Sequence, residues 1–312
     1  MKSTYFIIII LLVLILFVSG CGKTHPEITR YDNLPSNKQK MTPDLDEYPP
    51  VLHSNEFEKP VPLAAISTAG AEDSPFIPGD RKEMYYVFVP DPAVPIQEQV
   101  LDPTIGIWLS KYENGAWQTP TRVWLQKPGK LSLDGCTFVD GNVMLFCSAR
   151  EGYTGVHWFS AEYEEGKWNF GKHVQFPEEW EVGELHEYEN ELYYGSFVDG
   201  GKGGQDIWMI ERKSDGSWTD PINIENVNSP DNEGYPYISP DGKEMWINKW
   251  YLGSPSVWRS KKINGEWQEP ELIVSWFAGE PTLDWEGNLY FVHHYYKDSV
   301  MLEADIYVAY RK

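Results

Sequence analysis

Apolar and aromatic positions recur along the chain at an interval of about fifty residues. Four tryptophans stand fifty residues apart, and Tyr307 follows the last of them by forty-nine: Trp108, Trp158, Trp208 and Trp258. Nine or ten residues later comes a second tryptophan with a glycine two positions before it: Gly115-Ala-Trp117, Gly166-Lys-Trp168, Gly216-Ser-Trp218 and Gly265-Glu-Trp267. A glycine there, between short aromatic and β-branched runs, predicts a tight β-hairpin in each repeat.

Two further short apolar runs precede each hairpin. In one repeat they flank the turn Pro240-Asp-Gly242. Each period therefore holds four predicted strands, and no helical periodicity follows the first twenty residues. Four strands at this spacing are typical of a propeller blade, whereas a β-sandwich of irregular hairpins would have no reason to repeat every fifty residues.

The two ends of the repeat region indicate how the ring closes. Phe57, Pro60 and Leu63 match the spacing that follows the second tryptophans, although no complete unit precedes them, and the chain stops at Lys312 before a last fourth strand. We therefore predict an all-β, five-bladed β-propeller over residues 53–312, with the N-terminal strand completing the C-terminal blade. Such closure removes exposed sheet edges. Inner strands are expected near residues 75–77, 137–139, 185–188, 235–239 and 281–283.

Composition agrees with this fold and narrows the ligands. Aromatic residues make up 15% of the chain, and 26 glycines and 23 prolines supply turns. The 26 basic and 47 acidic residues give a net charge of −21, with no basic stripe, which argues against a nucleic-acid ligand. Cations and neutral sugars remain reasonable ligands.

The first twenty residues have the pattern of a secretory signal. Lys2 precedes an apolar run from Phe6 to Val18, which is too short to span a membrane comfortably. The segment Val18-Ser-Gly-Cys21 resembles the lipobox of bacterial lipoproteins. That resemblance implies cleavage before Cys21, a lipid on Cys21, and a protein anchored to a membrane on the extracytoplasmic side of the cell envelope. An uncleaved anchor is the alternative.

Residues 21–52 connect this signal to the propeller. They contain Pro26, Pro35, Pro43, Pro49 and Pro50 among polar residues, with few apolar side chains to bury. The composition predicts a disordered tether.

Two cysteines remain besides Cys21. Cys136 and Cys147 flank Asp140-Gly-Asn142. A two-residue loop of Gly141 and Asn142 would place them opposite each other, and a loop one residue earlier would separate them. A disulfide and two free thiols both remain open.

The candidate chemistry is a set of carboxylates, one near the start of each predicted inner strand. These are Asp73, Asp134, Glu184, Glu233 and Glu280. Propeller symmetry would bring them together at one mouth of the central channel, where like charges raise one another's pKa values. The ring could bind Ca²⁺ or sugar hydroxyls, or keep one acid protonated, while solvated turn caps are the alternative. No other cofactor is expected.

Histidines add little to this set. His186 lies close to Glu184 and could help to bind a ligand. His293 and His294 are neighbours in a predicted strand, so they point to opposite faces and cannot easily share a metal. No zinc-type ligand spacing is present in the sequence.

One repeat resembles a known family of envelope propellers. The segment Asn228-Ser-Pro-Asp-Asn-Glu-Gly-Tyr-Pro-Tyr-Ile-Ser-Pro-Asp-Gly-Lys243 is similar to the TolB-type repeat, with weaker copies over most of residues 53–312. This resemblance implies a binding or assembly platform with no inherent catalysis. We expect a monomer whose partner is a glycan or another envelope protein.

A second resemblance is to five-bladed glycosidases of the arabinanase and β-xylosidase type. In those enzymes the first three blades supply an Asp base, an Asp that orients and tunes, and a Glu acid, and Asp73, Asp134 and Glu184 occur here in that order. Aromatic residues that could stack on sugars are Trp180, Trp250 and Trp276. The insertion at residues 90–103 is a candidate rim of the ligand site, and sequence drift in a surface loop is the alternative.

Overall fold

The computed structural model describes residues 25–312, so the predicted leader and Cys21 lie outside the described part. Within this part the chain is built of short and medium strands, with two 3-10 turns, η1 (Ile96–Glu98) and η2 (Glu178–Trp180). None of its helices has the length and apolar character needed to cross a bilayer.

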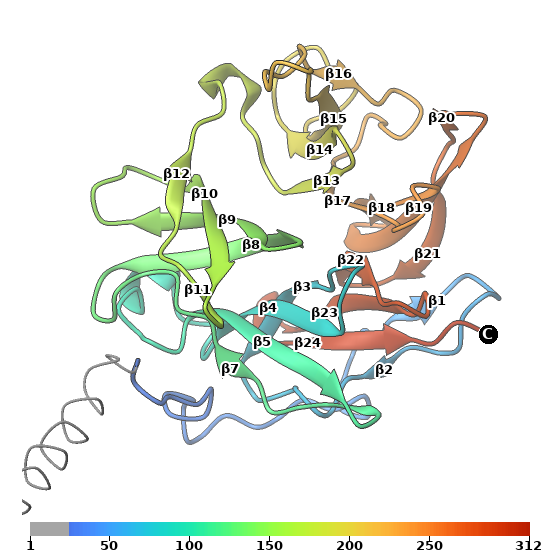
Figure 1. Ribbon diagram of the computed structural model, residues 1–312. Helices are drawn as coiled ribbons and strands as arrows, with labels where there is room; N and C mark the ends of the chain where they lie inside the picture. Colours follow the sequence, from blue (N-terminus) through green and yellow to red (C-terminus); the bar gives the residue numbers. More distant parts are fainter. Residues whose placement is uncertain (1–24) are drawn as a thin grey trace, which may run out of the picture.

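The strands form four hydrogen-bonded sheets around a central axis (Figure 1), and in the largest sheet a parallel bridge between β24 (Val300–Ala309) and β3 (Ala71–Phe76) joins two antiparallel groups. We number the antiparallel groups as blades 1 to 5 and give the strands of each from the axis outward. Blade 1 contains β3 (Ala71–Phe76), β4 (Glu83–Val89), β5 (Gly106–Glu113) and β7 (Thr121–Arg122); blade 2 contains β8 (Ser132–Asp140), β9 (Val143–Arg150), β10 (His157–Glu164) and β12 (Lys172–Val174); blade 3 contains β13 (Leu185–Tyr188), β14 (Glu191–Ser196), β15 (Asp206–Glu211) and β16 (Ile222–Asn223). Blade 4 contains β17 (Glu233–Ile238), β18 (Glu244–Tyr251), β19 (Ser254–Ile263) and β21 (Glu271–Ser275); blade 5 contains β22 (Ala278–Leu283), β23 (Leu289–Lys297), β24 (Val300–Ala309) and β2 (Val61–Pro62). The predicted all-β propeller is confirmed.

Four short strands complete the pairing. β6 (Ala116–Trp117), β11 (Lys167–Trp168) and β20 (Glu266–Trp267) fold back on β5, β10 and β19, which are the predicted glycine hairpins. β1 (Val51–Leu52) adds a strand to the outer edge of blade 4.

The N-terminal strand closes the ring as predicted. In β2, Val61 pairs with Val308 and Pro62 with Tyr307 of β24. Phe57 forms an isolated bridge with Arg311, in the place that a second tryptophan takes in other blades. β2 therefore pairs with the outer edge of β24, so that this edge is not exposed.

The second tryptophan of a repeat packs against the preceding blade. Trp117 lies edge-on to Tyr290 of blade 5 at 6.0 Å between ring centroids, Trp168 to Tyr85 of blade 1 at 6.3 Å, and Trp267 to Tyr193 of blade 3 at 6.0 Å. Phe57 makes the same contact with Trp246 of blade 4 at 6.0 Å. Edge-to-face aromatic pairs stabilise the fold beyond the burial of their apolar area. The second tryptophans therefore recur in the sequence because they form contacts between neighbouring blades.

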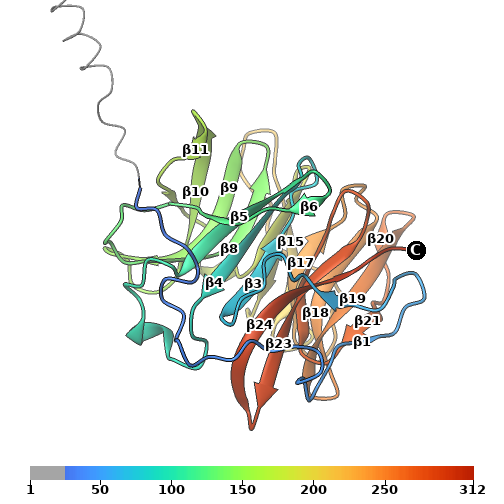
Figure 2. The ribbon, with the colours of Figure 1, turned by 90° about the horizontal axis from the view of Figure 1, so that it is seen from below.

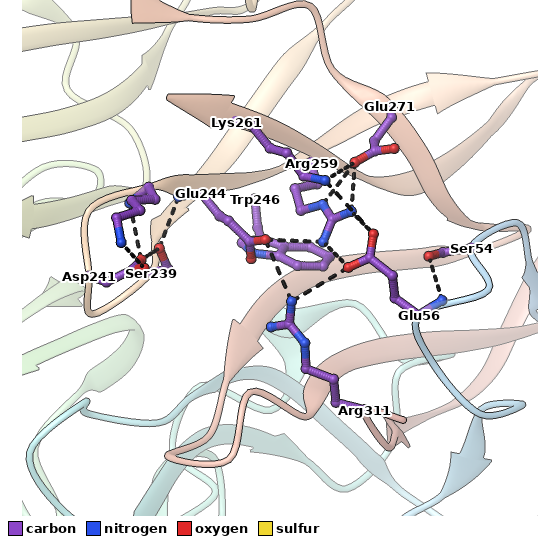
Figure 3. A network of polar contacts seen from close by, with 11 residues as sticks. Ser54, Glu56, Ser239, Asp241, Glu244, Trp246, Arg259, Lys261, Glu271 and Arg311 are labelled. Atoms are coloured by element: carbon purple, nitrogen blue, oxygen red, sulfur yellow. Dashed lines mark hydrogen bonds and ion pairs between the residues drawn. The ribbon is translucent and has the colours of Figure 1, made fainter. Parts of the chain in front are cut away.

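A buried arginine connects both ends of the propeller region to blade 4 (Figure 3). Arg259 on β19 is fully buried and contacts the carboxylates of Glu56 at 2.6 Å, Glu271 at 2.6 Å and Glu244 at 3.1 Å. Arg311, near the C-terminus, contacts Glu56 at 3.5 Å. The segment before Phe57, blade 4 and the last residues of the chain thus share one ionic network.

Residues 25–52 differ from the predicted tether, because they lie along blades 5 and 1 as an ordered strap. Arg30 is buried and binds the buried carboxylate of Glu72 at 2.6 Å. Further along the strap, Lys40 contacts Glu303 and Asp305 of β24, and Asp46 contacts His293 at 2.9 Å. The prediction from composition was wrong because ion pairs with buried partners hold the segment, together with the few apolar side chains Ile28, Leu34 and Met41 that pack against the core.

The Arg30 pair yields a test of the strap. Arg30→Ala leaves the carboxylate of Glu72 buried without its cation, so we expect the free energy of unfolding to fall by about 3–5 kcal/mol in denaturant titrations. The double variant Arg30→Ala, Glu72→Gln should recover part of this loss. If Arg30→Ala alone unfolds at the wild-type denaturant concentration, the strap does not contribute to stability.

The Arg259 network yields a prediction for pH. The hydrogen bond from Arg259 lowers the pKa of Glu56 from 4.5 to about 2. A lowered pKa in the folded state contributes stability above the ordinary pKa and loses it as the pH falls. Thermal unfolding should therefore show a loss of stability between about pH 4.5 and pH 2 that is smaller in Glu56→Gln. Superimposable profiles for the two proteins would contradict this assignment.

Candidate functional site

A β-bulge near the start of four of the inner strands decides which side chains face the axis. The pairing register shifts between Asp73 and Phe76, Gly135 and Phe138, Gly234 and Tyr237, and Gly279 and Thr282. One residue of each bulge has a positive φ near 50°: Ser74, Cys136, Tyr235 and Glu280. In blade 3 the equivalent residue is Glu184. His186 lies two residues after Glu184, just as Phe76 lies two residues after Ser74 in blade 1.

These five residues line one small cavity on the propeller axis. The cavity has a volume of ≈ 60 Å³ and is bordered by Ser74, Cys136, Glu184, Tyr235 and Glu280, one from each blade. A space of this size holds a few water molecules or a small polar group rather than a whole sugar ring. We call this end of the axis the channel mouth.

Aromatic rings close the floor of the mouth. His186 lies 4.9 Å from Phe138 and 4.8 Å from Tyr237 between ring centroids, and Phe76 lies 5.4 Å from Phe138. A separate cavity of ≈ 270 Å³ begins beyond these rings, lined by Glu187 and others at the opposite end of the axis. The channel is therefore blocked in the middle.

Of the five predicted carboxylates, three gather at the mouth and two do not. Glu184 and Glu280 line the cavity, and Asp73 immediately precedes Ser74. Asp134 is buried away from it, 3.1 Å from Arg150, and Glu233 is buried 3.2 Å from Lys249. The expected ring of five acids is thus corrected to a cluster of three.

The bulges explain the correction. The extra residue of a bulge turns the side chains on its two sides to opposite faces of the strand. A prediction that counts residues along a regular strand therefore placed Asp134 and Glu233 at the axis, although both face away from it. Glu72 is the true counterpart of Asp134 and Glu233, since each lies four residues before its ring at the floor. A hydroxyl residue four positions earlier marks two of these structural acids, because Thr68 bonds Glu72 and Ser229 bonds Glu233.

The pKa values of the three acids at the mouth are shifted in different directions. Burial raises the pKa of Glu184, and burial together with the charge of Asp73 raises the pKa of Glu280 well above its usual value. Burial acts most strongly on Asp73 and favours a raised pKa, but the charge and hydrogen bond of His294, 3.5 Å away, together with a hydrogen bond from the Ser74 backbone N–H, lower the pKa of Asp73 overall. The cluster therefore combines one carboxyl whose pKa is lowered with two whose pKa values are raised.

His294 was not among the predicted site residues. The sequence did predict that His293 and His294 face opposite sides, and they contact different acids, Asp46 and Asp73. Nothing in the sequence pairs His294 with Asp73, because the contact joins blade 5 to blade 1.

Two polar atoms at the mouth lack a partner within the described residues. They are Oε2 of Glu280 and Oγ1 of Thr137, both buried. Burial of His186 lowers its pKa to about 3, so its imidazole is neutral. Since buried polar groups are normally hydrogen-bonded, these atoms are suited to a polar group that enters the cavity.

The predicted stacking tryptophans lie around the mouth without lining the cavity. Trp276 precedes β22, Trp180 precedes β13, and Trp250 ends β18 beside the start of β17, which places all three on the mouth side. Trp250 is 49% exposed and accessible to a ligand. Tyr48 of the strap already stacks on Trp276 at 6.4 Å.

The insertion in blade 1 follows the mouth end of β4. Asp91 at its start contacts Lys38 of the strap at 2.9 Å, and Leu101 near its end is 69% exposed. The insertion is therefore placed on the mouth side, where the rim element was expected.

Cys136 and Cys147 are free thiols. The loop of Gly141 and Asn142 forms, with Asp140 paired to Val143, but the bulge shifts the register so that Cys147 faces Gly135 rather than Cys136. Within residues 25–312 no three or more His, Cys, Asp and Glu side chains are grouped so as to hold a metal ion.

Comparisons with known proteins support the fold. No protein-family model matches the chain. No curated protein matches it either. Among solved structures, Bacteroides ovatus Xyloglucan PUL GH43B is 14% identical with a TM-score of 0.50, over 80% of this chain and 54% of that one.

Two further structures represent the two kinds of protein that the sequence resembles. Endo-arabinase from Bacteroides thetaiotaomicron is 15% identical with a TM-score of 0.48, over 80% of this chain and 97% of that one. TolB from Acinetobacter baumannii is 14% identical with a TM-score of 0.45, over 78% of this chain and 56% of that one. The chain thus spans little more than half the length of TolB and of the xyloglucan-locus protein. Identities this low establish the propeller fold and no activity.

The contact between Asp73 and His294 can be tested directly. Replacing His294 with Gln removes the attraction that lowers the pKa of Asp73 and leaves its burial, so this pKa should rise above the ordinary value of 3.8. Carboxyl-detected NMR titration of Asp73 measures the change. His157→Gln on blade 2 is the control, and an unchanged titration of Asp73 in His294→Gln would refute the contact.

Proposed function

We propose that this protein is a lipid-anchored propeller of the cell envelope that binds a neutral glycan at the channel mouth. The observation that carries the proposal is the cavity bordered by one residue from each blade, in which Glu280 Oε2 and Thr137 Oγ1 lack partners. Burial raises the pKa values of Glu184 and Glu280, and a carboxyl that holds its proton both donates and accepts hydrogen bonds, as sugar hydroxyls require. The cavity would take a single hydroxyl-bearing group of the ligand.

The surroundings of the mouth support a neutral ligand. His294 is engaged by Asp73, and the bases Arg150 and Lys249 are bound to Asp134 and Glu233. An anionic ligand would therefore meet acids without a free cation among the residues lining the cavity. Trp250 and Trp180 are placed to pack against the apolar faces of sugar rings around the opening.

The location in the envelope rests on the sequence. The segment before Cys21 resembles a lipoprotein signal, and we propose acylation of Cys21 as the anchor, with the propeller on the extracytoplasmic side. A monomer is the proposed state, and Ca²⁺ at the mouth remains an alternative way to neutralise Asp73.

Hydrolysis of a glycan is the second candidate function. The opposite pKa shifts of Asp73 and Glu184 favour it, because sugar hydrolysis needs one ionised and one protonated carboxyl. Asp73 would be the base and Glu184 the acid. Asp134 cannot take the tuning role that the glycosidase resemblance implies, since Arg150 binds it away from the mouth; Glu280 stands closer to the pair.

A binding experiment tests the glycan proposal. We expect the mature protein to bind at least one member of an array of neutral oligosaccharides, with calorimetry providing Kd. Glu280→Ala should weaken that binding about tenfold or more, because a hydrogen bond to a buried group is lost. Glu280→Gln should bind within a few-fold of the wild type, since an amide replaces a protonated carboxyl.

The matched control is Glu187→Gln, on the same axis but in the cavity beyond the aromatic floor. It should leave Kd unchanged. Binding to no glycan, or equal loss in Glu187→Gln and Glu280→Ala, would reject the proposal.

The two candidate functions separate in one variant. Glu184→Gln should retain glycan binding in either case, and it should abolish release of nitrophenol from 4-nitrophenyl arabinofuranoside or xyloside only if the protein is a hydrolase. Absence of release by the wild type rules out the hydrolase candidate for these substrates and leaves binding as the function.

A further inference from the structure

The described chain begins on the outer edge of the propeller. The ring of His25 stacks on Trp124 at 5.4 Å and lies edge-on to Phe170 at 6.2 Å. Trp124 follows β7 of blade 1, and Phe170 lies between β11 and β12 of blade 2. Figure 2 shows this start, in blue, next to blades 1 and 2. The strap therefore enters the fold at the junction of these two blades.

The strap leaves little free chain between this edge and Cys21. Four residue steps separate His25 from Cys21, and an extended chain spans at most about 3.6 Å per residue, so Cys21 lies within about 14 Å of His25. Because Arg30 and Lys40 fix the strap by ion pairs, the following residues cannot lengthen this reach. An acyl group on Cys21 would hold the edge next to the bilayer.

The side chains of this edge suit a membrane surface. Leu101 is 69% exposed and Phe170 is 40% exposed. Leu101 and Trp124 share a groove with the exposed Lys127 and Lys130. Tryptophan with exposed apolar residues and lysines is typical of surfaces that meet lipid headgroups, where the ring lies at the interface and the ammonium groups reach phosphates.

The charges of the edge differ from those of the whole protein. The chain carries a net −21, which opposes contact with anionic lipid over most of its surface. The two carboxylates of the groove are engaged internally, Asp102 with Thr104 and Asn33 and Asp134 with Arg150. Lys130 also contacts Glu151 at 2.7 Å, and both side chains are half exposed.

We propose that the edge formed by Leu101, Trp124, Phe170, Lys127 and Lys130 rests on the lipid bilayer and fixes the orientation of the propeller. This inference rests on the lipid anchor of the proposed function. Blade 4 lies across the ring from this edge and points away from the membrane. Because the strap is fixed to the propeller, a lipid on Cys21 would hold the propeller in one orientation at the bilayer.

Quenching by brominated lipid tests the contact. The mature acylated chain is placed in vesicles of phosphatidylethanolamine and phosphatidylglycerol in which a fraction of the acyl chains is brominated. We expect quenching of part of the tryptophan emission, and we expect Trp124→Phe to lose most of the quenched component. Trp250→Phe is the matched control, because Trp250 is 49% exposed on blade 4 and should not be quenched.

A charge substitution tests the same contact without changing a tryptophan. Leu101→Asp combined with Phe170→Asp should abolish quenching while the protein still floats with the vesicles. Ile222→Asp, at a 52% exposed position on blade 3, should leave quenching as in the wild type.

The outcomes separate the inference from the anchor. An acylated, floating protein whose Trp124→Phe variant is quenched as strongly as the wild type overturns the docking edge alone. A mature chain whose mass lacks acyl groups and which does not float overturns the anchor and the docking edge together.

Discussion

The pairing of Val61–Pro62 with Val308 and Tyr307 is the contact on which the other features of the molecule depend. Without it β24 would expose an unpaired edge and blade 5 would have three strands. Closure also sets the spacing of the inner strands around the axis, so that one residue from each blade reaches the same cavity. The Arg259 network lies beside this closure and joins the segment before β2, blade 4 and the C-terminus. The two ends of the propeller region are thus held together by ion pairs as well as by strand pairing.

The bulges of the inner strands divide the acidic residues into two kinds. Carboxylates before the bulge, such as Asp134 and Glu233, turn outward and meet a base inside the blade. Those at or next to the bulge, Glu184, Glu280 and Asp73, turn to the axis, where burial raises the pKa values of the two glutamates and contact with His294 lowers that of Asp73. An acidic residue two positions before the positive-φ residue of the bulge is thus part of a buried ion pair away from the axis, whereas one at or next to that residue belongs to the cluster at the axis.

The strap is a second case in which amino-acid composition did not predict the structure. Its prolines and polar residues predict disorder on the assumption that order requires apolar burial. Instead, Arg30 and Asp46 find partners in Glu72 and His293, which lie on different strands of the ring. The pairing could not be read from the strap alone, because its partners come together only after blades 5 and 1 have met. The cysteines are a smaller case, since their loop was predictable and the bulge between them was not.

The sequence by itself determined the repeat unit, the four strands of each blade, the hairpin glycines and the closure by the N-terminal strand. These follow from local patterns, and Trp117, Trp168 and Trp267 of the repeat each contact an aromatic residue of the preceding blade. Only the tertiary structure decided which acids face the axis, that His294 stands beside Asp73, and that the strap is ordered. The physical reason is that local preference fixes the form of a strand, whereas the direction and partner of a charged side chain depend on register shifts and on neighbours distant in sequence.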